Sequence, residues 1–480
     1  MLHLTGRIEK EPNEFIDEKI LTPQFNFELE HLLNHYIRIE KVLAKEYERL
    51  QIISNVENEK ISISLNKISA NKIMSNAKKN MSDISFAIER FVEEDLRSVP
   101  PGWHTDRSRN DVQSCAQIMF VREQVILLSN ELHQLCKSLL LRADETLNKP
   151  FPGRTHYQPA QIITPGFYFL SIVEELLQAG DVLLYTFDRI NQCPLGAGAM
   201  SGLEFNWDRT KMAKALGFNK PKDMALTSVA SRQWILEVAS IQSNLGVLIS
   251  RLVTDIIGWC VSKYVDLPDD LAGISSAMPQ KKNYPILERI RGQTSHMSSF
   301  YNDLIISQKN TPFSNLVETS KEGCKYVLEL FSTSNMNLKL LKMTIDNLIF
   351  NEKQMREDCE KDFYGGFSLA NYLTSEFKIP NRKSQAITGN IIRIAIERNL
   401  TPQNINSSLI IEECSKHGYE VFLNNQLIRR LFSTHYNLNK KTTGSTSPDS
   451  VKVKISEYRK RLNQSEKEWD VRVRKVLGNY

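Results

Sequence analysis

The chain of 480 residues lacks several features that would point to a function at once. It contains no glycine-rich phosphate-binding loop, no dinucleotide-binding fingerprint and no Asp/Glu/His cluster with the spacing of a metal site. Its seven cysteines form no Cys-x-x-Cys pair, and scattered cysteines are typical of free thiols in a reducing cytosol. We therefore expect a cytoplasmic protein that uses no metal and no cofactor.

The chain also lacks a strong excess of charge and a long apolar run. Its 61 basic and 56 acidic residues leave a net charge of only +5, which does not demand a nucleic-acid or anionic-membrane partner. No apolar run approaches the ~18 residues that indicate a membrane span. The N-terminal stretch "MLHLTGRIEKEPNEF" has no basic-then-apolar signal pattern. We expect neither nucleic acid nor membrane among its partners.

Strand signals are sparse, and long helical patterns dominate the chain. Residues 15–100 show an apolar band at helical spacing, and residues 114–147, 165–190 and 286–310 are similar. One stripe is clearest, at Ile235, Val238, Ile241, Leu245, Leu248, Leu252 and Ile256. Apolar residues flank that stripe, so the helix is expected to be buried among other helices. This favours an extended bundle completed by other subunits, with a monomer that has one large core as the alternative.

Turn residues divide this all-α chain into three expected helical domains. The Pro-Pro-Gly in "VPPGWHTDRSRNDV" interrupts the first helical region, and shorter helices with more frequent turns follow residue 355. We predict an N-terminal helical domain at 1–105, a central bundle of long helices at 106–355 and a small C-terminal helical domain at 356–480. The last helix is charged, and its lysines and arginines are expected to form a solvated face.

Three polar segments interrupt the apolar helices. The first, residues 102–112, reads "GWHTDRSRNDV" and places Arg107 and Arg109 beside Ser108 and Asn110. Guanidinium groups with neighbouring hydroxyl and amide donors suit a planar carboxylate. The structural alternative is a loop in which Ser108 or Asn110 caps a helix and the arginines lie in water.

The second and third polar segments add groups for acid–base chemistry. Residues 153–161, "GRTHYQPAQ", offer His156 before an apolar helix, although a lone histidine there is more often only hydrogen-bonded. Residues 272–288, "AGISSAMPQKKNYPILE", carry Ser275, Lys281 and Asn283. Lys281 can lower the electrostatic cost of an alkoxide, and Gly273 permits loop movement. A solvated loop is the alternative. Together the three segments suit metal-free chemistry on a small dicarboxylate.

These segments, in this order, resemble the fumarase/aspartase superfamily. "SSAMPQKKN" resembles its signature loop Gly-Ser-Ser-x-Met-Pro-x-Lys-x-Asn, and "HTDRSRND" and "THYQPAQ" resemble runs of argininosuccinate lyases. "PLGAGAMSG" and the tail "GSTSPDSV" are also similar, so the likeness extends from about residue 15 to 455. It implies a homotetramer whose central helices form one bundle, with each active site built from three subunits.

The resemblance further implies a carbon–nitrogen lyase. The implied reaction is reversible elimination of an amine from an N-substituted aspartate with release of fumarate, with argininosuccinate giving arginine and fumarate as the first assignment. By analogy Ser275 is the base, and Lys281 and Asn283 hold the developing aci-carboxylate. His156, paired with Glu288, assists protonation of the departing nitrogen, or organises the site if the acid lies elsewhere. The expected substrate-binding residues are Ser108, Arg109, Asn110, Thr155, Gln158 and Lys321.

Four departures from the family pattern bear on these roles. Ile274 stands at a glycine of the signature, and Asp106 stands at a small residue. The family's Glu-Asp-x-His pattern is matched to Glu94, Asp95 and Arg97. In the segment that holds the amino-acid end of arginine, "FSNLVETSK" keeps Lys321 but has Phe313 for Tyr and Glu318 for Gln.

These departures leave several functions open. The substrate is either argininosuccinate or an N-succinyl compound of a different amine. Whether the reaction releases fumarate or joins it to the amine stays open. A catalytically silent structural homologue and a nucleotide-directed lyase of the superfamily are the competing interpretations. Retention of Ser275, His156, Lys281, Asn283 and Glu288 argues against the silent homologue. The lack of an added phosphate-binding cluster argues against the nucleotide-directed lyase.

Overall fold

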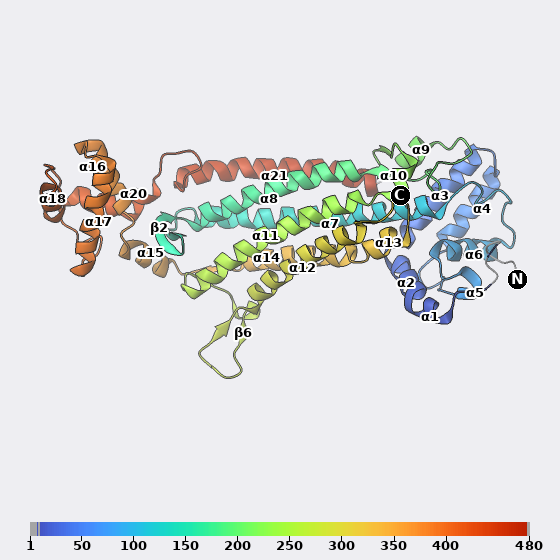
Figure 1. Ribbon diagram of the computed structural model, residues 1–480, viewed down its shortest axis with the longest axis horizontal. Coiled ribbons are helices and arrows are strands. Elements are labelled where there is room, and N and C mark those ends of the chain that lie inside the picture. Colours follow the sequence, from blue (N-terminus) through green and yellow to red (C-terminus); the bar gives the residue numbers. More distant parts are fainter. Residues whose placement is uncertain (1–6, 8–9, 478–480) are drawn as a thin grey trace.

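Six helices of 20 or more residues form the body of the protein within the residues described, which are residue 7 and residues 10–477 of the computed structural model. These helices run along the long axis of an elongated molecule (Figure 1). They are α7 (Arg109–Thr146), α8 (Pro165–Ile190), α11 (Gln233–Val261), α12 (Pro285–Gln308), α14 (Val327–Asp346) and α21 (Pro448–Leu477).

Shorter helices cover the two ends of this bundle. The N-terminal end carries α1 (Glu14–Ile16), the π-helix η1 (Asp17–Leu21), α2 (Thr22–His31), α3 (Leu33–Arg49), α4 (Asn55–Asn66), α5 (Ala77–Asn80), α6 (Ile84–Leu96), α9 (Arg209–Ala215), α10 (Ala225–Ala230), α13 (Val317–Ser320) and η3 (Glu322–Cys324). The opposite end carries η2 (Asp269–Leu271), α15 (Glu352–Lys361), α16 (Gly366–Phe377), α17 (Asn381–Glu397), α18 (Ser407–Lys416), α19 (Asn425–Phe432) and α20 (Thr434–Leu438).

The strands in the described residues are short and form pairs rather than a layer. The antiparallel pairs are β1 (Phe151–Thr155) with β2 (Gln158–Ile163), β5 (Val265–Asp266) with β8 (Ile349–Phe350), and β6 (Gly273–Ile274) with β7 (Lys282–Asn283). The parallel pair is β3 (Gln192–Cys193) with β4 (Lys220–Pro221). The all-α prediction is therefore confirmed.

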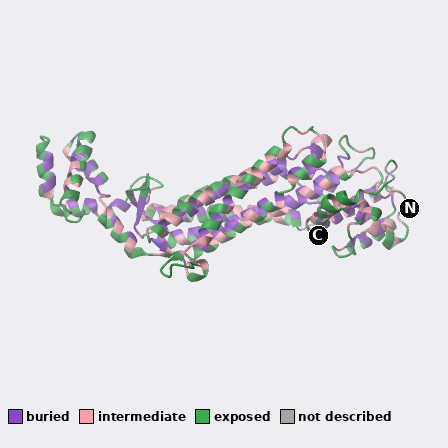
Figure 2. Ribbon diagram, turned by 60° about the horizontal axis from the view of Figure 1, so that its bottom comes forward, coloured by how far each residue is buried: buried purple, intermediate pink, exposed green. Residues whose placement is uncertain are grey.

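The apolar stripes predicted from the sequence face the core. In α11 six of the seven stripe residues are buried, and Leu248 is half-buried against the same cluster. Figure 2 shows buried positions along the facing sides of the long helices and exposed positions in the loops. By length and composition alone α11 could cross a membrane, but the core helix of a soluble protein meets the same test. The buried apolar stripe identifies α11 as a core helix of the bundle.

Two large apolar clusters run through the described residues. One apolar cluster includes residues from Phe25 to Met355, on both sides of residue 105, and residues from Val451 to Val476, while a second spans Leu369 to Phe432. The division at 105 and 355 remains a prediction.

The last helix of the expected C-terminal domain, 356–480, packs along the main bundle. Helix α21 returns along α7 and α8 (Figure 1), and Val451, Ile455, Leu462 and Trp469 join the main cluster. The expected solvated face exists, but it belongs to a helix whose other face completes the bundle.

Candidate active site

The first polar segment leads into the N-terminus of α7. Ser108 is the N-cap residue, and its Oγ accepts a hydrogen bond from the backbone N–H of Asn110 at 3.2 Å. The structural reading of Ser108 as a helix cap is therefore correct. The position also suits an anion, because the N–H groups and dipole of a long helix favour negative charge at its N-terminus.

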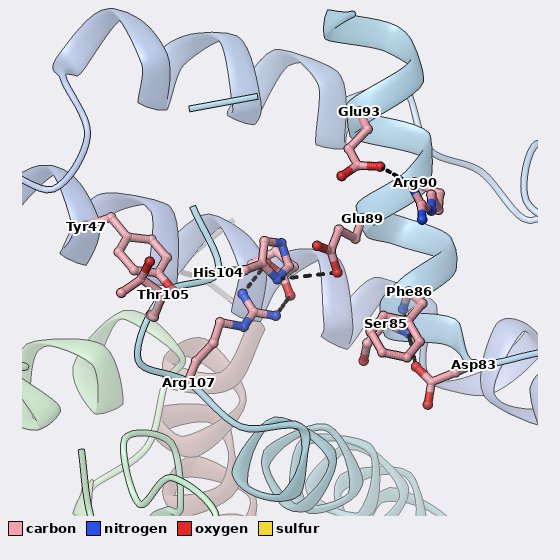
Figure 3. A network of polar contacts seen from close by, with 11 residues as sticks. Tyr47, Asp83, Ser85, Phe86, Glu89, Arg90, Glu93, His104, Thr105 and Arg107 are labelled. Atoms are coloured by element: carbon pink, nitrogen blue, oxygen red, sulfur yellow. Dashed lines mark hydrogen bonds and ion pairs between the residues drawn. The ribbon is translucent and has the colours of Figure 1, made fainter. Parts of the chain in front are cut away.

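Two predicted substrate-binding residues beside Ser108 already have partners within the chain. The exposed Arg109 guanidinium donates to Asp83 Oδ2 at 2.8 Å and lies 4.8 Å from the ring centre of Phe86. Asn110 Nδ2 donates to the backbone carbonyl of Ala199 at 3.2 Å. Asp83 and Phe86 lie at the start of α6 (Figure 3), so α6 holds the arginine from one side.

Arg107 has a structural partner rather than a free carboxylate-binding fork. Its guanidinium is buried and forms a two-pronged ion pair with Glu40 of α3, with one Nη–Oε distance of 2.8 Å. Burial raises the pKa of Glu40, but Arg107 outweighs this effect and holds the pKa below its usual value. The pair therefore fixes the backbone just before Ser108.

A second layer of contacts supports the same backbone (Figure 3). Tyr47 Oη donates to the carbonyl of Thr105 at 2.7 Å, and His104 Nδ1 lies 3.8 Å from a carboxylate oxygen of Glu89. Burial, aided by Arg107, lowers the pKa of His104 to about 3. A neutral imidazole is therefore expected at physiological pH.

Asp106, one of the departures from the family pattern, has a structural role. Its carboxylate accepts hydrogen bonds from the backbone N–H groups of Glu204 and Phe205 and from Trp207 Nε1, at 2.8–3.1 Å. It thereby ties the first polar segment to the loop that precedes α9.

Asp111 binds the earlier part of that same loop. Its buried carboxylate accepts the backbone N–H groups of Gly196 and Gly198 at 2.8 and 3.0 Å. Burial raises the pKa of Asp111 to about 6, against the lowering effect of these hydrogen bonds. Residues 194–208 are thus docked onto the start of α7 by two carboxylates.

The second polar segment forms the tip of the β1–β2 hairpin. Thr155 pairs with Gln158, so His156 and Tyr157 are the two turn residues, with φ of 53° and 60°. Positive φ at both positions is the backbone of a tight hairpin turn, and it is uncommon for residues other than glycine. Thr155, His156 and Gln158 are all exposed, at the end of the bundle away from the start of α7 (Figure 1).

The third polar segment is the loop between β6 and β7, which projects from the side of the bundle (Figure 1). Ser275 Oγ accepts the backbone N–H of Met278 at 3.1 Å, and Asn283 Nδ2 donates to the carbonyl of Ile274 at 3.2 Å. Lys281 is exposed, and so is Ile274, at 94%. The loop therefore brings Ser275, Lys281 and Asn283 together on one exposed hairpin.

The base of this loop is held by a neighbouring lysine. The ammonium of Lys282 lies 3.2 Å from Asp266 and 3.0 Å from Asp269. Glu288 follows in the first turn of α12 and is exposed. Among the described residues it has no hydrogen bond or ion pair with His156, so the predicted His156–Glu288 pair is not formed within the chain.

Lys321 lies at the opposite end of the bundle, near the first polar segment. Its ammonium is 3.2 Å from Glu28 of α2, whose pKa is raised by burial and lowered in part by Lys321. Asp83 and Arg109 also act on the pKa of Glu28, so the four charges form one cluster. Lys321 thus belongs to the same cluster of charges as Arg109, which follows Ser108 in the chain.

Sequence reasoning missed the acidic members of this cluster. Glu28 stands between Phe25 and Leu32 at helical spacing, so a carboxylate on an apolar stripe was the available signal. Asp83, the N-cap residue of α6, is the other acidic member, and it contacts Arg109. Asp95, to which the family pattern is matched, is bound by Lys67 at 2.8 Å.

Within the described residues of the chain, the three polar segments do not come together at one place. Ser108, Arg109, Asn110 and Lys321 gather at one end, while His156 and Ser275 lie on separate hairpins towards the other. The described residues contain no group of three or more His, Cys, Asp or Glu side chains arranged to hold a metal ion. What this geometry offers is a donor-rich helix N-terminus, a histidine turn and a serine–lysine–asparagine loop.

Comparison with known proteins identifies the family. A family model described as lyase matches residues 7–319. Argininosuccinate lyase of Ehrlichia ruminantium (strain Welgevonden) is 31% identical over 323 residues, which cover 66% of this chain and 69% of the relative. Argininosuccinate lyase of Aquifex aeolicus (strain VF5) is 30% identical over 402 residues, which cover 82% and 86%.

Solved structures share the fold. A variant of EDDS lyase with bound fumarate has a TM-score of 0.84 at 21% identity, covering 99% of this chain and 94% of that one. Class II fumarase from Schistosoma mansoni has a TM-score of 0.70 at 15% identity, covering 86% and 94%. The chain therefore belongs to the argininosuccinate lyase family of the fumarase/aspartase superfamily and is a carbon–nitrogen lyase.

Proposed function

We propose that the protein catalyses the reversible elimination of an amine from an N-succinyl compound with release of fumarate, and that argininosuccinate is the compound. Family membership and the names of the curated relatives support this assignment. The observation that carries the proposed chemistry is the single exposed loop with Ser275, Lys281 and Asn283.

The chemical difficulty is the proton on the carbon next to a carboxylate. Its removal places a second negative charge on that carboxylate, giving an aci-carboxylate dianion. Pre-placed donors and a cation reduce this cost because they need no reorganisation when the charge develops. Lys281 supplies the cation and Asn283 the neutral donor in this proposal.

Ser275 is the proposed base. A serine hydroxyl ionises only when its anion is stabilised, and Ser275 Oγ already accepts a backbone N–H from Met278. The ammonium of Lys281, on the same loop, would add an electrostatic contribution. Closing of the loop over substrate would exclude water and strengthen both effects.

His156 is proposed to assist the departing nitrogen, with Glu288 as its partner. Both side chains are exposed in one chain, so neither carries a competing buried contact. His156 at the tip of a tight turn projects where a second subunit can meet it. The proposed pairing therefore requires a neighbouring subunit.

The start of α7 is the proposed carboxylate-binding site. Ser108 and Asn110 offer hydroxyl and amide groups at the helix N-terminus, and Arg109 offers a guanidinium held by Asp83 and Phe86. Thr155 and Gln158 would complete the site from the hairpin.

A cytoplasmic homotetramer is the proposed assembly, with small dicarboxylate and amine molecules as its ligands. Exposed apolar side chains on the long helices support further burial, among them Val182, Tyr185, Val247 and Val261, which are 52–79% exposed. The seven free cysteines support a reducing compartment.

A different amine is the second candidate, and Lys321 favours it. Glu28 lies 3.2 Å from Lys321 and already compensates its charge, so a substrate carboxylate there would meet a weaker cation. Phe313 is 61% exposed, and Glu318 is exposed too, so both are available to contact a different ligand. Lys321, Phe313 and Glu318 are therefore the residues that distinguish argininosuccinate from a compound of a different amine.

The test is to supply purified protein with argininosuccinate, and separately with fumarate and a panel of amines, while following the absorbance of fumarate. Argininosuccinate turnover supports the first candidate, and consumption of fumarate only with another amine supports the second. Absence of turnover with every N-succinyl compound and every amine would reject the enzyme assignment and leave the silent homologue.

A further inference from the structure

A groove lined by positive charge lies at the N-terminal end of the molecule, between α3, α4 and α9. Its volume is about 770 Å³, and ten residues line it. None of the ten is aspartate or glutamate. Half of them are cationic: Arg38, Lys41, Lys45, Lys211 and Lys214.

The positions of these cations on their helices bring like charges together. Residues 38, 41 and 45 follow the three- and four-residue spacing of one face of α3, and residues 211 and 214 share a face of α9. Like charges at such spacing destabilise a helix. The fold therefore maintains this groove against electrostatic repulsion.

Among the described residues, carboxylates lie close to two of these cations. Arg38 lies 3.9 Å from Glu123, and Lys211 lies 3.5 Å from Asp208. Lys41 and Lys45 have no carboxylate within 4 Å among the described residues. The nearby Glu48 carboxylate is bound by the amide groups of Asn55 and Asn58.

The cavity near Lys321 does not share this excess of positive over negative residues. It holds about 520 Å³ and is lined by three lysines and three glutamates. The α3–α4–α9 groove is lined by five cations and no acid, although the whole chain has a net charge of only +5. A weakly charged protein that concentrates lysines in one concave site suits an anionic ligand.

The sequence alone shows no such cluster of basic residues, because the cations come from α3 and α9, which are far apart in the chain. We propose that this groove binds a small molecule carrying two or more phosphate groups. Lysine ammonium groups bind phosphate as point charges, and several phosphates are needed to balance several cations. The volume lies in the range of small-molecule sites. Val42, Ala215 and Leu216 give the groove an apolar wall, and Ser62 and Asn66 give it hydrogen-bonding groups, so an organic part of the ligand is also accommodated.

The groove is separate from the proposed active site but shares its supports. On α3, Glu40 binds Arg107, and Glu46 accepts the backbone N–H of Asp208 at 3.0 Å, just before α9. Arg49 donates to the carbonyl of Asn206. A ligand that binds lysines of both α3 and α9 would add a further link between these two helices.

The experiment is titration calorimetry of the full-length protein at low salt with inorganic tripolyphosphate and with a nucleoside triphosphate. The variant K41Q/K45Q/K211Q removes three groove charges. Its matched control, K353Q/K383Q/K467Q, removes three charges from exposed lysines elsewhere. Circular dichroism melting confirms that both variants are folded.

We expect the parent and the control to bind tripolyphosphate equally and the groove variant to bind at least about tenfold more weakly. If the nucleoside triphosphate binds more tightly than tripolyphosphate, the apolar wall contacts the organic part of the ligand. If the two bind equally, the groove recognises phosphate alone. Equal loss in both variants, or no heat with either probe, would overturn the proposal. A short DNA duplex that binds the groove more tightly than both probes would also overturn it.

Discussion

At the scale of single residues, the proposed chemistry depends on which charges are already compensated. Arg107 is committed to Glu40 and Lys321 to Glu28, whereas Lys281 and His156 are exposed. Buried, paired charges serve the structure because breaking such a pair leaves an uncompensated ion. The exposed groups are the ones available to react with a ligand.

Replacement of the proposed base tests this view directly. Ser275→Ala should lower kcat about 10²–10⁴-fold, the range that a positioned general base contributes, with a small change in KM. Fumarate absorbance in steady-state assays gives both constants. Ser276→Ala is the matched control, since it removes the adjacent hydroxyl from the same loop. Parent-like turnover by Ser275→Ala would end the assignment of Ser275 as the base.

The buried Glu40–Arg107 pair predicts a loss of stability. Glu40→Gln leaves the Arg107 guanidinium buried without its counter-charge, which should cost about 3–5 kcal/mol in the free energy of unfolding. Denaturant titration measures this loss. Glu48→Gln, on the exposed side of the same helix, should cost far less. Comparable losses in the two variants would contradict the structural role of the pair.

The same pair predicts a dependence of stability on pH. Because the pKa of Glu40 is lower in the folded protein than in the unfolded chain, its contribution is complete above the unfolded value of about 4.3. The contribution is lost as the pH falls through the lower, folded value. Denaturant titrations of parent and Glu40→Gln across this window should therefore converge on acidification, and a constant difference would contradict the prediction.

At the scale of elements, α21 decides where the bundle ends. Its apolar face packs against α7 and α8, and the ring centre of Trp469 lies 5.2 Å from that of Phe187 in an edge-to-face contact. Most charged residues of α21 are exposed, and three of its arginines also form ion pairs with α7 and α8: Arg459 with Asp144, Arg461 with Asp181 and Arg472 with Asp188. The helix therefore belongs energetically to the main core despite following the small C-terminal unit in the chain.

Trp469→Ala tests the place of α21. Trp469 is 4% exposed, and removal of a buried tryptophan side chain costs about 3–5 kcal/mol through lost burial and the cavity left behind. Val471→Ala, at a 53% exposed position on the same helix, should be close to neutral. Thermal melting of the bundle provides the measurement. A Trp469→Ala protein that melts like the parent would show that α21 does not complete the core.

At the scale of the whole molecule, the separation of the polar segments is the main feature. Ser108 lies at one end of the bundle, and His156 and Ser275 lie on hairpins towards the other. Helices rising 1.5 Å per residue keep such ends far apart, and a rigid bundle cannot fold back on itself. The proposed active site, which combines all three segments, would therefore require more than one subunit.

Mixing of inactive variants tests this sharing. Ser275→Ala and Ser108→Ala proteins should each be weakly active, and their joint unfolding and refolding should restore part of the fumarate-forming activity. Hybrid assemblies would contain some sites with both native residues. Each variant refolded alone is the control. Failure of the mixture to exceed the mean of the two controls, with hybrid assembly confirmed by mass, would contradict a shared site.

The sequence by itself determined the helices, the chemical groups and their grouping into three polar segments. Helical periodicity is local, so the stripe from Ile235 to Ile256 could be assigned without a fold, and Ser275 to Asn283 lie within one loop. The resemblance carried by those motifs led to the correct family.

Only the tertiary structure decided which charged groups are free and where the last helix lies. Glu40 and Arg107 are 67 residues apart, and Glu28 and Lys321 are 293 apart, so no local pattern could reveal either pair. Asp106 likewise acquired its role from a loop nearly a hundred residues later. Ion pairing and burial depend on distance in space, which the chain sets only when its long helices pack.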